Sequence, residues 1–570
     1  MIRAMLRPDR RAFVSLCTSL GLGSTLLPGV LWAQMQPGTK AVTLDMVRES
    51  ATLAGIDWTD AECQELVASL SSLARGAEGI DKATLTNASP LPIHFNPRPT
   101  GRSTPVVSAS VFQTQPAPAV ARPRQLETVA FWPVTHLAHL IETRQVRSTE
   151  LTTMYLDRLK RYNGQINCVA ALTEERAMAE AAAADKDIAA GKYRGTLHGI
   201  PYGVKDIIAA KGYPTRWGAA PLADQTFAED ATVVERLRGA GAVLVAKLTT
   251  GELAFGDQWS GGRTNNPWNL AEGSSGSSAG SAAATAAGLV AFAIGSDTGG
   301  SILSPAARCG VVGLRPTFGR VSRFGVMAAG TTLDKIGPLC RYAQDCMIVL
   351  KAIAGPDSRD MAVTDEPINW NAATGRFPKR IGYVPAMFDV ETNADRRTNN
   401  DNVLATLRQL GCSLHSVTMP SGDLSYYIEY TERAAAFESM TSHGLYKGVS
   451  RRTSGYLRAC QLVTAVDYLQ ANRRRAVIMQ QVAAAMATVD AVMFTSLTLD
   501  SRTSLNPVMS LTGHPSVSVP SGFAPGGSPT AVMFSGQLYH ESELMALAKA
   551  YEDATGRRQT PPLFTVATVR

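Results

Sequence analysis

The amino-acid sequence predicts an α/β domain built around a substantially parallel β-sheet. From about residue 127 onwards, helical and strand patterns alternate, which is typical of helices packed against such a sheet. Some strand candidates are short continuous apolar runs, as expected for strands that are buried on both faces. The chain has 570 residues, 45% of them apolar and 18% charged, which is ordinary for a globular protein with a large core.

The elements are expected in the following order. A helix over 149–162 begins after Ser148 as its N-cap, and a second over 174–190 begins after Thr173 and stops at Gly191. A helix over 232–238 precedes a buried strand over 242–248. The remaining predicted elements are a strand over 289–294 preceded by a helix over 281–288, and later strands over 381–384 and 491–495.

The N-terminus has the layout of an export signal. Arg10–Arg11 is followed by Ala12-Phe13 and then by an apolar run that is broken by glycines and Pro28. This pattern predicts a twin-arginine signal peptide over 1–33 and an exported protein, periplasmic or secreted. A transmembrane anchor is the alternative, although the run is short and only mildly apolar. After removal of the signal we expect no stable membrane insertion.

Three further regions follow the signal segment. Residues 34–86 form a predicted helical extension, since leucines recur near a helical period over 41–76. Residues 87–126 are rich in Pro and Ser and predict a linker or wrapping arm. Residues 127–570 form the main domain.

Charge and cysteine usage exclude several classes of protein. The formal net charge is +7, of which residues 1–33 contribute +3, and no dense basic run is interleaved with aromatics. We therefore expect no nucleic-acid partner. The eight cysteines include no C-x-x-C pair and no Cys/His cluster, so no metal site is predicted. The cysteines are interpreted as small buried apolar residues.

The region 271–317 is dense in Gly, Ser and Ala, and it contains two conspicuous serine sites. Ser277 and Ser278 stand between Gly276 and Ala279-Gly280, whereas Ser301 follows Thr298-Gly299-Gly300. A Gly-Gly-Ser turn lets consecutive backbone N–H groups point into one space, as an oxyanion hole requires. A flexible low-complexity linker is the alternative, but the apolar strand and small-residue helix within the region argue against it.

A serine nucleophile needs a base, and no histidine of this chain has an obvious link to either serine site. A lysine can serve when burial keeps it neutral. Lys205 stands alone among apolar residues and glycines in HGIPYGVKDI, which makes it the candidate base. On context alone, a surface lysine at a strand edge is an equal alternative.

These motifs together resemble the amidase signature family. Gly199-Ile200-Pro201-x-Gly203-Val204-Lys205-Asp206 is similar to the family's lysine motif. Gly276-Ser277-Ser278-x-Gly280-Ser281 and Gly295-x-Asp297-Thr298-Gly299-Gly300-Ser301-Ile302 are similar to its long Gly/Ser signature. Further similar blocks continue in order, so that the resemblance covers roughly 130–562. Ordered matches of this length are far more specific than one short motif.

The resemblance implies a fold, a site and a reaction. The fold is a large twisted mixed β-sheet sandwiched by α-helices. Ser301 matches the nucleophile, Ser277 the bridging serine on a cis peptide, and Lys205 the base, while Thr298, Gly299, Gly300 and Ser301 supply the oxyanion hole. The implied reaction hydrolyses a small amide to an acid and an amine or ammonia through an acyl-enzyme, with no cofactor and no metal.

The sequence departs from the family pattern at two positions. Leu303 stands where the family usually has Arg two residues after the nucleophile, and Ala279 stands where Gly is common. Loss of the arginine charge is expected to change the support of the catalytic loop or the pocket. Neither departure touches the three candidate residues.

Several alternatives remain open from the sequence. Gly276-x-Ser278-x-Gly280 also fits a nucleophile elbow, with Ser278 as nucleophile and His514 or His540 as base. The same family includes the ammonia-delivering component of the tRNA-linked amidotransferases, and a catalytically inactive binding protein is a third possibility. An esterase or carbamate hydrolase, the particular substrate, and a homodimer are also left open.

Overall fold

The computed structural model describes two compact units, residues 1–85 and 86–570. The described residues are 42–53, 56–78, 93–99, 111–115, 118–389, 391, 393–420, 425–442, 444–461, 463–495, 505–556 and 559–565. The predicted signal segment 1–33 lies outside them. The predicted boundaries of the linker and the main domain stay predictions.

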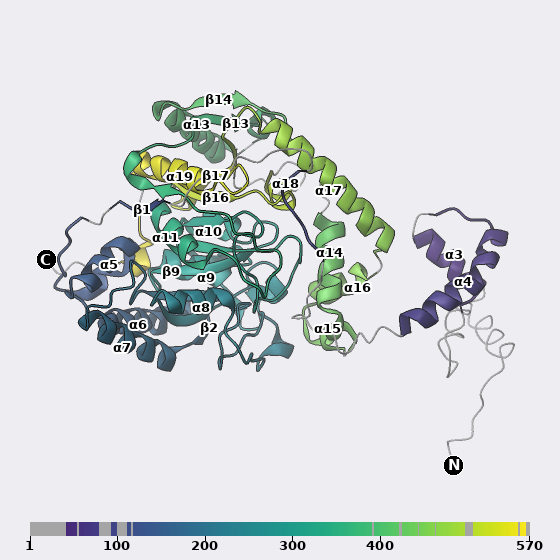
Figure 1. Ribbon diagram of the computed structural model, residues 1–570, viewed down its shortest axis with the longest axis horizontal. Helices are drawn as coiled ribbons and strands as arrows, with labels where there is room; N and C mark the ends of the chain where they lie inside the picture. Colours follow the sequence, from purple (N-terminus) through teal and green to yellow (C-terminus); the bar gives the residue numbers. More distant parts are fainter. Residues whose placement is uncertain are drawn as a thin grey trace, which may run out of the picture. The chain divides into compact units, whose positions relative to one another are not determined.

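Among its described residues, the first unit contains two helices, α3 (Leu44–Leu53) and α4 (Asp60–Glu78) (Figure 1). Both fall where the leucine spacing predicts helical structure. The Arg48 guanidinium joins the two helices through a hydrogen bond of 2.7 Å from its Nε to Asp60 Oδ1. Val47, Ala51 and Cys63 are buried between them.

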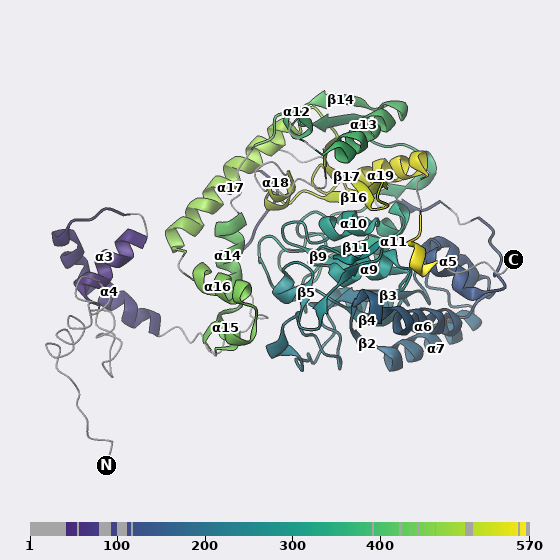
Figure 2. The ribbon, with the colours of Figure 1, turned by 180° about the vertical axis from the view of Figure 1, so that it is seen from behind.

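The second unit is built on a mixed sheet, which in the described part of the chain has eleven strands (Figures 1 and 2). Four of the ten neighbouring strand pairs are parallel and six are antiparallel. The fold class that the resemblance implies is therefore confirmed, whereas a substantially parallel sheet describes only part of it. In spatial order the strands are β14 (Ser413–Ser416), β13 (Arg380–Tyr383), β15 (Ala491–Thr495), β17 (Pro529–Gly536), β16 (Ser516–Phe523), β10 (Val312–Arg315), β11 (Lys335–Cys340), β9 (Phe292–Asp297), β3 (Pro201–Lys205), β4 (Val243–Leu248) and β2 (Val169–Leu172).

Two hydrophobic cores cover the two faces of this sheet. Along β15, Ala491 and Met493 belong to one core, and Val492 and Phe494 belong to the other. This alternation follows from the two-residue period of a strand. Helices α8 (Thr232–Gly239), α11 (Ala343–Ile353) and α19 (Glu541–Thr555) contribute to the first core, and α9 (Ala279–Ala286), α10 (Leu303–Cys309) and α17 (Ala465–Ala485) contribute to the second.

The remaining elements surround this sandwich. The other α-helices are α5 (Val134–Glu142), α6 (Ser148–Ile166), α7 (Glu174–Ala189), α12 (Pro385–Asp389), α13 (Ala394–Gln409), α14 (Ser425–Ala436), α15 (Glu438–Ser442), α16 (Arg451–Cys460) and α18 (Leu505–Leu511). Within the residues that the structure describes, three small two-stranded sheets pair β1 (Phe112–Gln113) with β12 (Trp370–Asn371), β5 (Gln258–Trp259) with β6 (Gly262–Arg263), and β7 (Asn265–Asn266) with β8 (Asn269–Gly273). Among the described helices, none has the length and apolar character to cross a membrane.

Most predicted elements occur where expected, with two informative differences. The strand predicted over 289–294 begins instead at Phe292, because the residues after α9 first form a turn. Ser148 is the first residue of α6 and not its N-cap. Its hydroxyl donates to the Gly199 carbonyl oxygen (2.9 Å), and the Asp185 carboxylate accepts from the Ser148 N–H (2.6 Å) instead.

The sheet brings distant segments of the chain to one edge. Strand β3 is parallel to β9, so Lys205 and Asp297, the last residues of these two neighbouring strands, lie at the same end of the sheet. Strand β11 is antiparallel to β9, with Lys335 opposite Asp297, and therefore begins at the same edge. Functional side chains of open α/β sheets commonly gather at this end of the strands.

Candidate active site

Lys205 is the last residue of β3, an interior strand between β4 and β9. Its side chain is fully buried. The Nζ atom donates to Ser277 Oγ at 2.7 Å and to Ser296 Oγ at 2.8 Å. The lysine is therefore not a solvated residue of a strand edge, and its contacts are with hydroxyl groups.

Burial lowers the pKa of Lys205 from its ordinary value of 10.5 to about 7. The carboxylates of Asp297 and Asp334 act in the opposite direction, and the guanidinium of Arg433 lowers the pKa further. An amine with this pKa is partly neutral at physiological pH. It can therefore accept a proton from a serine hydroxyl, which an ordinary lysine cannot do.

Two other lysines of the described chain are as deeply buried, but their surroundings differ. Lys247 lies 2.7 Å from the Asp206 carboxylate in an ion pair. Lys335 donates to Ser510 Oγ at 2.8 Å, and burial holds its pKa well below the ordinary value. Of these three lysines, Lys205 is the one that contacts a candidate serine.

Ser277 lies in a turn that precedes α9, and the Gly276–Ser277 peptide bond is cis. The side chain is 1% exposed. A Cβ at position 276 would lie 1.9 Å from the Gly256 carbonyl oxygen, so glycine is required there. The close approach of these two loops places Ser277 against the Lys205 amine.

Ser301 lies in the loop that runs from Thr298 to α10. Its carbonyl oxygen accepts a hydrogen bond from the Ser278 N–H at 3.0 Å, which joins the loops of the two candidate serines. Gly300 has φ +130°, and a Cβ there would lie 2.3 Å from Asn506 Nδ2. The glycine before Ser301 is thus required by both backbone conformation and space.

Asp297 holds the 298–301 loop from inside, and its contacts bear on the predicted oxyanion hole. Its Oδ1 accepts from the Gly300 N–H at 2.7 Å, and its Oδ2 accepts from the Ile302 N–H at 2.8 Å. The Gly300 amide is therefore hydrogen-bonded to a carboxylate. Because this amide already has an acceptor, the amides of Thr298, Gly299 and Ser301 are the stronger candidates, and the predicted oxyanion hole of Thr298, Gly299, Gly300 and Ser301 stays a prediction.

The Asp297 carboxylate is balanced by a buried arginine. Arg315 Nη1 lies 3.2 Å from Asp297 Oδ1 and also donates to Asn506 Oδ1 at 2.6 Å. Burial alone would raise the pKa of Asp297, but Arg315, Lys335 and the loop amides hold it below its ordinary value. Leu303, in the position where the family usually has arginine, is fully buried in the second core.

The surroundings of Ser278 differ from those that a nucleophile elbow requires. The Ser278 hydroxyl donates to the Ser296 carbonyl oxygen at 3.1 Å and accepts from the Ser296 N–H at 3.2 Å. The preceding strand β8 belongs to a small two-stranded sheet and not to the main sheet. His514 contacts Thr512 Oγ1 at 2.8 Å, and His540 faces Glu543 at 3.4 Å. We therefore interpret Ser278 as a structural residue.

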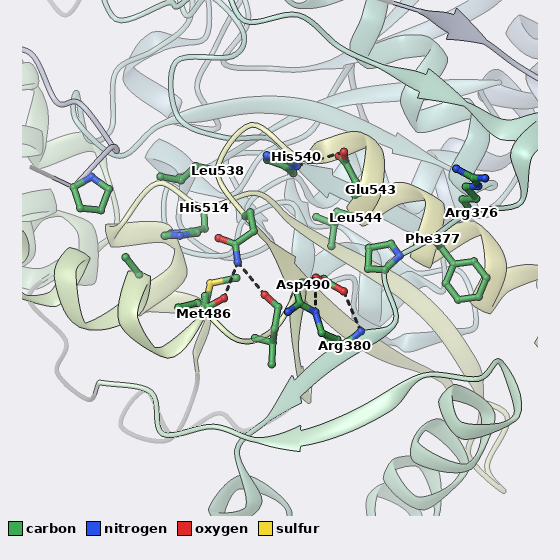
Figure 3. Close-up of a pocket in the computed structure, with 16 residues that line it drawn as sticks. Arg376, Phe377, Arg380, Met486, Asp490, His514, Leu538, His540, Glu543 and Leu544 are labelled. Atoms are coloured by element: carbon green, nitrogen blue, oxygen red, sulfur yellow. Dashed lines mark hydrogen bonds and ion pairs between the residues drawn. The ribbon is translucent and has the colours of Figure 1, made fainter. Parts of the chain in front are cut away.

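A cavity of about 760 Å³ lies elsewhere along the same edge of the sheet (Figure 3). It is lined by residues next to β13, β15 and β17, including Arg380, Asp490, Gln537 and both His514 and His540. Lys205, Ser277 and Ser301 do not line it. The cavity is therefore separate from the cluster of candidate residues.

Sequence reasoning missed the residues that support the cluster. Asp297, Ser296 and Asp334 all contact the candidate residues or their loop, and Asp334 Oδ1 accepts from Thr298 Oγ1 at 2.6 Å. An aspartate followed by a Gly-Gly turn was a usable signal for Asp297, because short carboxylates commonly accept from amides two or three residues further on. Arg433 has no such local signal.

The fold and this cluster define a class: an α/β protein with a buried amine beside two serine loops at one sheet edge. A family model described as Amidase matches residues 150–545. A putative amidase AmiD of Mycobacterium tuberculosis is 35% identical over 457 residues, covering 75% of this chain and 96% of the relative. The glutamyl-tRNA(Gln) amidotransferase component of Geotalea daltonii is 33% identical over 470 residues, with coverages of 73% and 95%.

Solved structures agree with these relatives. The native peptide amidase of Stenotrophomonas maltophilia superposes with a TM-score of 0.69 and 29% identity, covering 76% of this chain and 99% of that one. The chain therefore belongs to the amidase family, the amidase signature enzymes. It is an enzyme that acts on amides.

Proposed function

We propose that this enzyme hydrolyses a small carboxylic amide with Ser301 as nucleophile, Ser277 as proton bridge and Lys205 as base. The observation that carries the proposal is the contact of 2.7 Å between the Lys205 amine and Ser277 Oγ, at a lysine whose pKa burial lowers to about 7. The hydrogen bond from the Ser278 amide to the Ser301 carbonyl supports it, because it joins the two serine loops.

Acylation begins with neutral Lys205. The amine takes the proton of Ser277, Ser277 takes the proton of Ser301, and Ser301 Oγ forms a bond to the amide carbon. The carbonyl oxygen becomes an oxyanion, which backbone N–H groups of Thr298, Gly299 and Ser301 are the candidates to stabilise. The lysine is then protonated, and the positive charge lies beside a developing negative one.

Collapse of the tetrahedral intermediate breaks the C–N bond. The proton on Lys205 returns through Ser277 to the departing nitrogen, which leaves as an amine or ammonia. The acyl group remains as an ester on Ser301. Water then attacks this ester with the same relay as base, and the acid is released with Ser301 restored.

The test is covalent labelling with a fluorophosphonate, followed by mass spectrometry of the modified peptide. We expect the label on Ser301, no label in Ser301→Ala, and turnover of at least one member of a panel of simple amides. Ester and carbamate substrates belong in the same panel. A label on Ser278, or full amide turnover by Ser301→Ala, would exclude the proposed nucleophile.

An amidotransferase role is the second candidate, because the amidotransferase component of Geotalea daltonii is 33% identical to this chain. In that role the chain would pass ammonia to a partner. Purification of the tagged chain from its own cell distinguishes the two: a stoichiometric protein partner favours amidotransfer, and an active lone chain favours hydrolysis.

We also propose that the enzyme is exported after cleavage near residue 33, on the basis of the Arg10–Arg11 pair and the apolar run that follows it. N-terminal sequencing of the protein from the producing cell tests this proposal, and an intact Met1 would refute it. A homodimer is proposed as well, and light scattering of the purified enzyme decides its oligomeric state.

A further inference from the structure

Helix α14 lies far from the candidate residues in sequence but contacts the loops that hold them. It packs with α16 and α17 beside the sheet, as both views of the ribbon show (Figures 1 and 2). Two consecutive residues of this helix, Glu432 and Arg433, are 2% and 1% exposed. Consecutive positions on a helix point about 100° apart, so each reaches a different neighbour.

Arg433 contacts the loop that follows β4. Its Nη1 donates to the Leu253 carbonyl oxygen at 2.7 Å, and its guanidinium lies 4.1 Å from the centre of the Phe255 ring. Its Nη2 donates to Glu429 Oε1 at 2.6 Å. Leu253 and Ala254 have positive φ angles of 47° and 65°, so this loop has a conformation that needs support from outside.

The loop held by Arg433 forms the wall behind Ser277. The Gly256 carbonyl oxygen approaches the α-carbon of Gly276 so closely that a Cβ there would lie 1.9 Å away. The Asp257 carboxylate accepts from the Ser275 N–H at 3.1 Å. A shift of residues 253–257 would therefore move the turn that presents Ser277 to Lys205.

Glu432 contacts the other half of the cluster. Its carboxylate accepts from the Thr332 N–H at 2.9 Å and from Thr332 Oγ1 at 2.7 Å. Two residues further on, Asp334 accepts from Thr298 Oγ1 at 2.6 Å. The Glu432 side chain therefore holds the loop over 332–334, which in turn contacts Thr298, the first residue of the 298–301 loop.

We infer that Arg433 and Glu432 are positioning residues, through which helix α14 holds the Ser277 turn and the Thr298 loop in register for amide hydrolysis. The inference rests on the proposed function and adds a part of the chain that none of the family motifs contains. Arg433 has a second effect, because its charge opposes protonation of the Lys205 amine. The charged groups that act on Lys205 are Asp297 and Asp334, which favour its protonated form, and Arg433, which disfavours it.

Two variants of Arg433 separate the effect of its charge from the effect of its contacts with the loop that follows β4. Arg433→Met removes both the charge and the contacts, and we expect the midpoint of the pH–rate profile to rise, because loss of a nearby positive charge favours the protonated amine. We also expect kcat at its plateau to fall at least about tenfold, since misplacement of catalytic groups by 1 Å can cost about a hundredfold. Arg433→Lys keeps the charge, so its midpoint should stay at the wild-type value while kcat falls.

Glu432→Gln tests the inference even if the Arg433 variants do not fold. We expect a lower kcat with an unchanged KM, because the Thr332 loop is loosened without loss of a substrate contact. The matched control is Arg158→Met. Arg158 is also fully buried and bonds backbone carbonyl oxygens of Gly288 and Ala287 at 2.8 and 2.9 Å. This control should lower thermal stability and leave the pH midpoint and kcat unchanged.

The readouts are steady-state hydrolysis of the best panel amide and the rate of fluorophosphonate labelling, both measured across pH for every variant. Wild-type labelling at Ser301 with a pH midpoint tests the proposed function by itself. The differences between variants and wild type test the role of α14. The inference is overturned if Arg433→Met keeps the wild-type midpoint and kcat, if Arg158→Met moves the midpoint equally, or if Glu432→Gln has wild-type kcat.

Discussion

The protonation of Lys205 should set the acid limb of the pH–activity profile. With a pKa of about 7, the amine is about one-tenth neutral at pH 6 and about nine-tenths neutral at pH 8, so the rate should rise about tenfold between them. At the ordinary value of 10.5, the neutral fraction at pH 7 would be about a thousandfold smaller. Burial of this side chain therefore favours the neutral form by about 5 kcal/mol.

The assay is the second-order rate of fluorophosphonate labelling of the enzyme between about pH 5.5 and 9.5. It needs no knowledge of the natural substrate and reports the activation of the nucleophile itself. Lys205→Met keeps a side chain of similar length without an amine, and it should label about a hundredfold to ten-thousandfold more slowly at every pH. Circular dichroism checks that the variant is folded.

Two results would contradict this reasoning. A labelling rate that does not change across the whole range would mean that no group with a pKa near 7 activates the nucleophile. A midpoint that survives in folded Lys205→Met would assign the titration to another group. Either outcome removes Lys205 from the role of base, whereas a midpoint that is lost together with the amine supports it.

Further changes test the surroundings of the site. Ser278→Ala should keep at least about half of wild-type kcat, since its lost hydrogen bonds contribute about 1 kcal/mol each to stability and none to proton transfer; near-complete loss of turnover would revive the elbow mechanism. Asp297→Asn leaves Arg315 without its carboxylate and should lower the free energy of unfolding in urea by about 3 to 5 kcal/mol. Leu303→Arg should not restore a missing function but should lower the melting temperature by several degrees, because the position is fully buried in apolar surroundings. Burial lowers the pKa of His514 to about 3. Between about pH 6.5 and about pH 3, this histidine is therefore protonated in the unfolded chain and neutral in the folded chain. Stability is then fully present above about pH 6.5 and is lost by about 1.4 kcal/mol per unit as the pH falls, and His514→Gln should flatten this acid limb in urea titrations at several pH values.

The sequence allowed the fold class and the three candidate residues to be predicted because both depend on local patterns. Apolar runs such as 242–248 and 491–495 identify interior strands, and both occur as β4 and β15. The glycines near Ser277 and Ser301 mark places where the backbone must come close to another loop. Gly276 and Gly300 meet this condition, since a Cβ at either would lie within 2.3 Å of another atom.

The supporting residues could not be predicted in the same way, because their roles depend on partners that only the folded sheet brings next to them. Asp297 is balanced by Arg315 and Lys335, which reach it through the order of β9, β11 and β10 in the sheet. The sequence predicts the Gly300 amide as one of the oxyanion donors, but a Gly-Gly-Ser turn does not reveal which amides a neighbouring carboxylate will engage. That information appears only when Asp297 is seen to accept from it at 2.7 Å.

The three buried lysines show most clearly why the fold is needed to choose a base. Each lies in an apolar strand, so the residues around it do not show which polar partner its amine receives. In the structure, Lys247 is stabilised as a cation by the Asp206 carboxylate at 2.7 Å, and Lys335 contacts Ser510. Lys205 contacts hydroxyl groups instead, so the amine loses little interaction energy when it gives up its charge. One of those hydroxyl groups belongs to Ser277. Chemistry at this edge therefore follows from which polar partner each amine receives, and the order of the strands and the loops that follow them determine that partner.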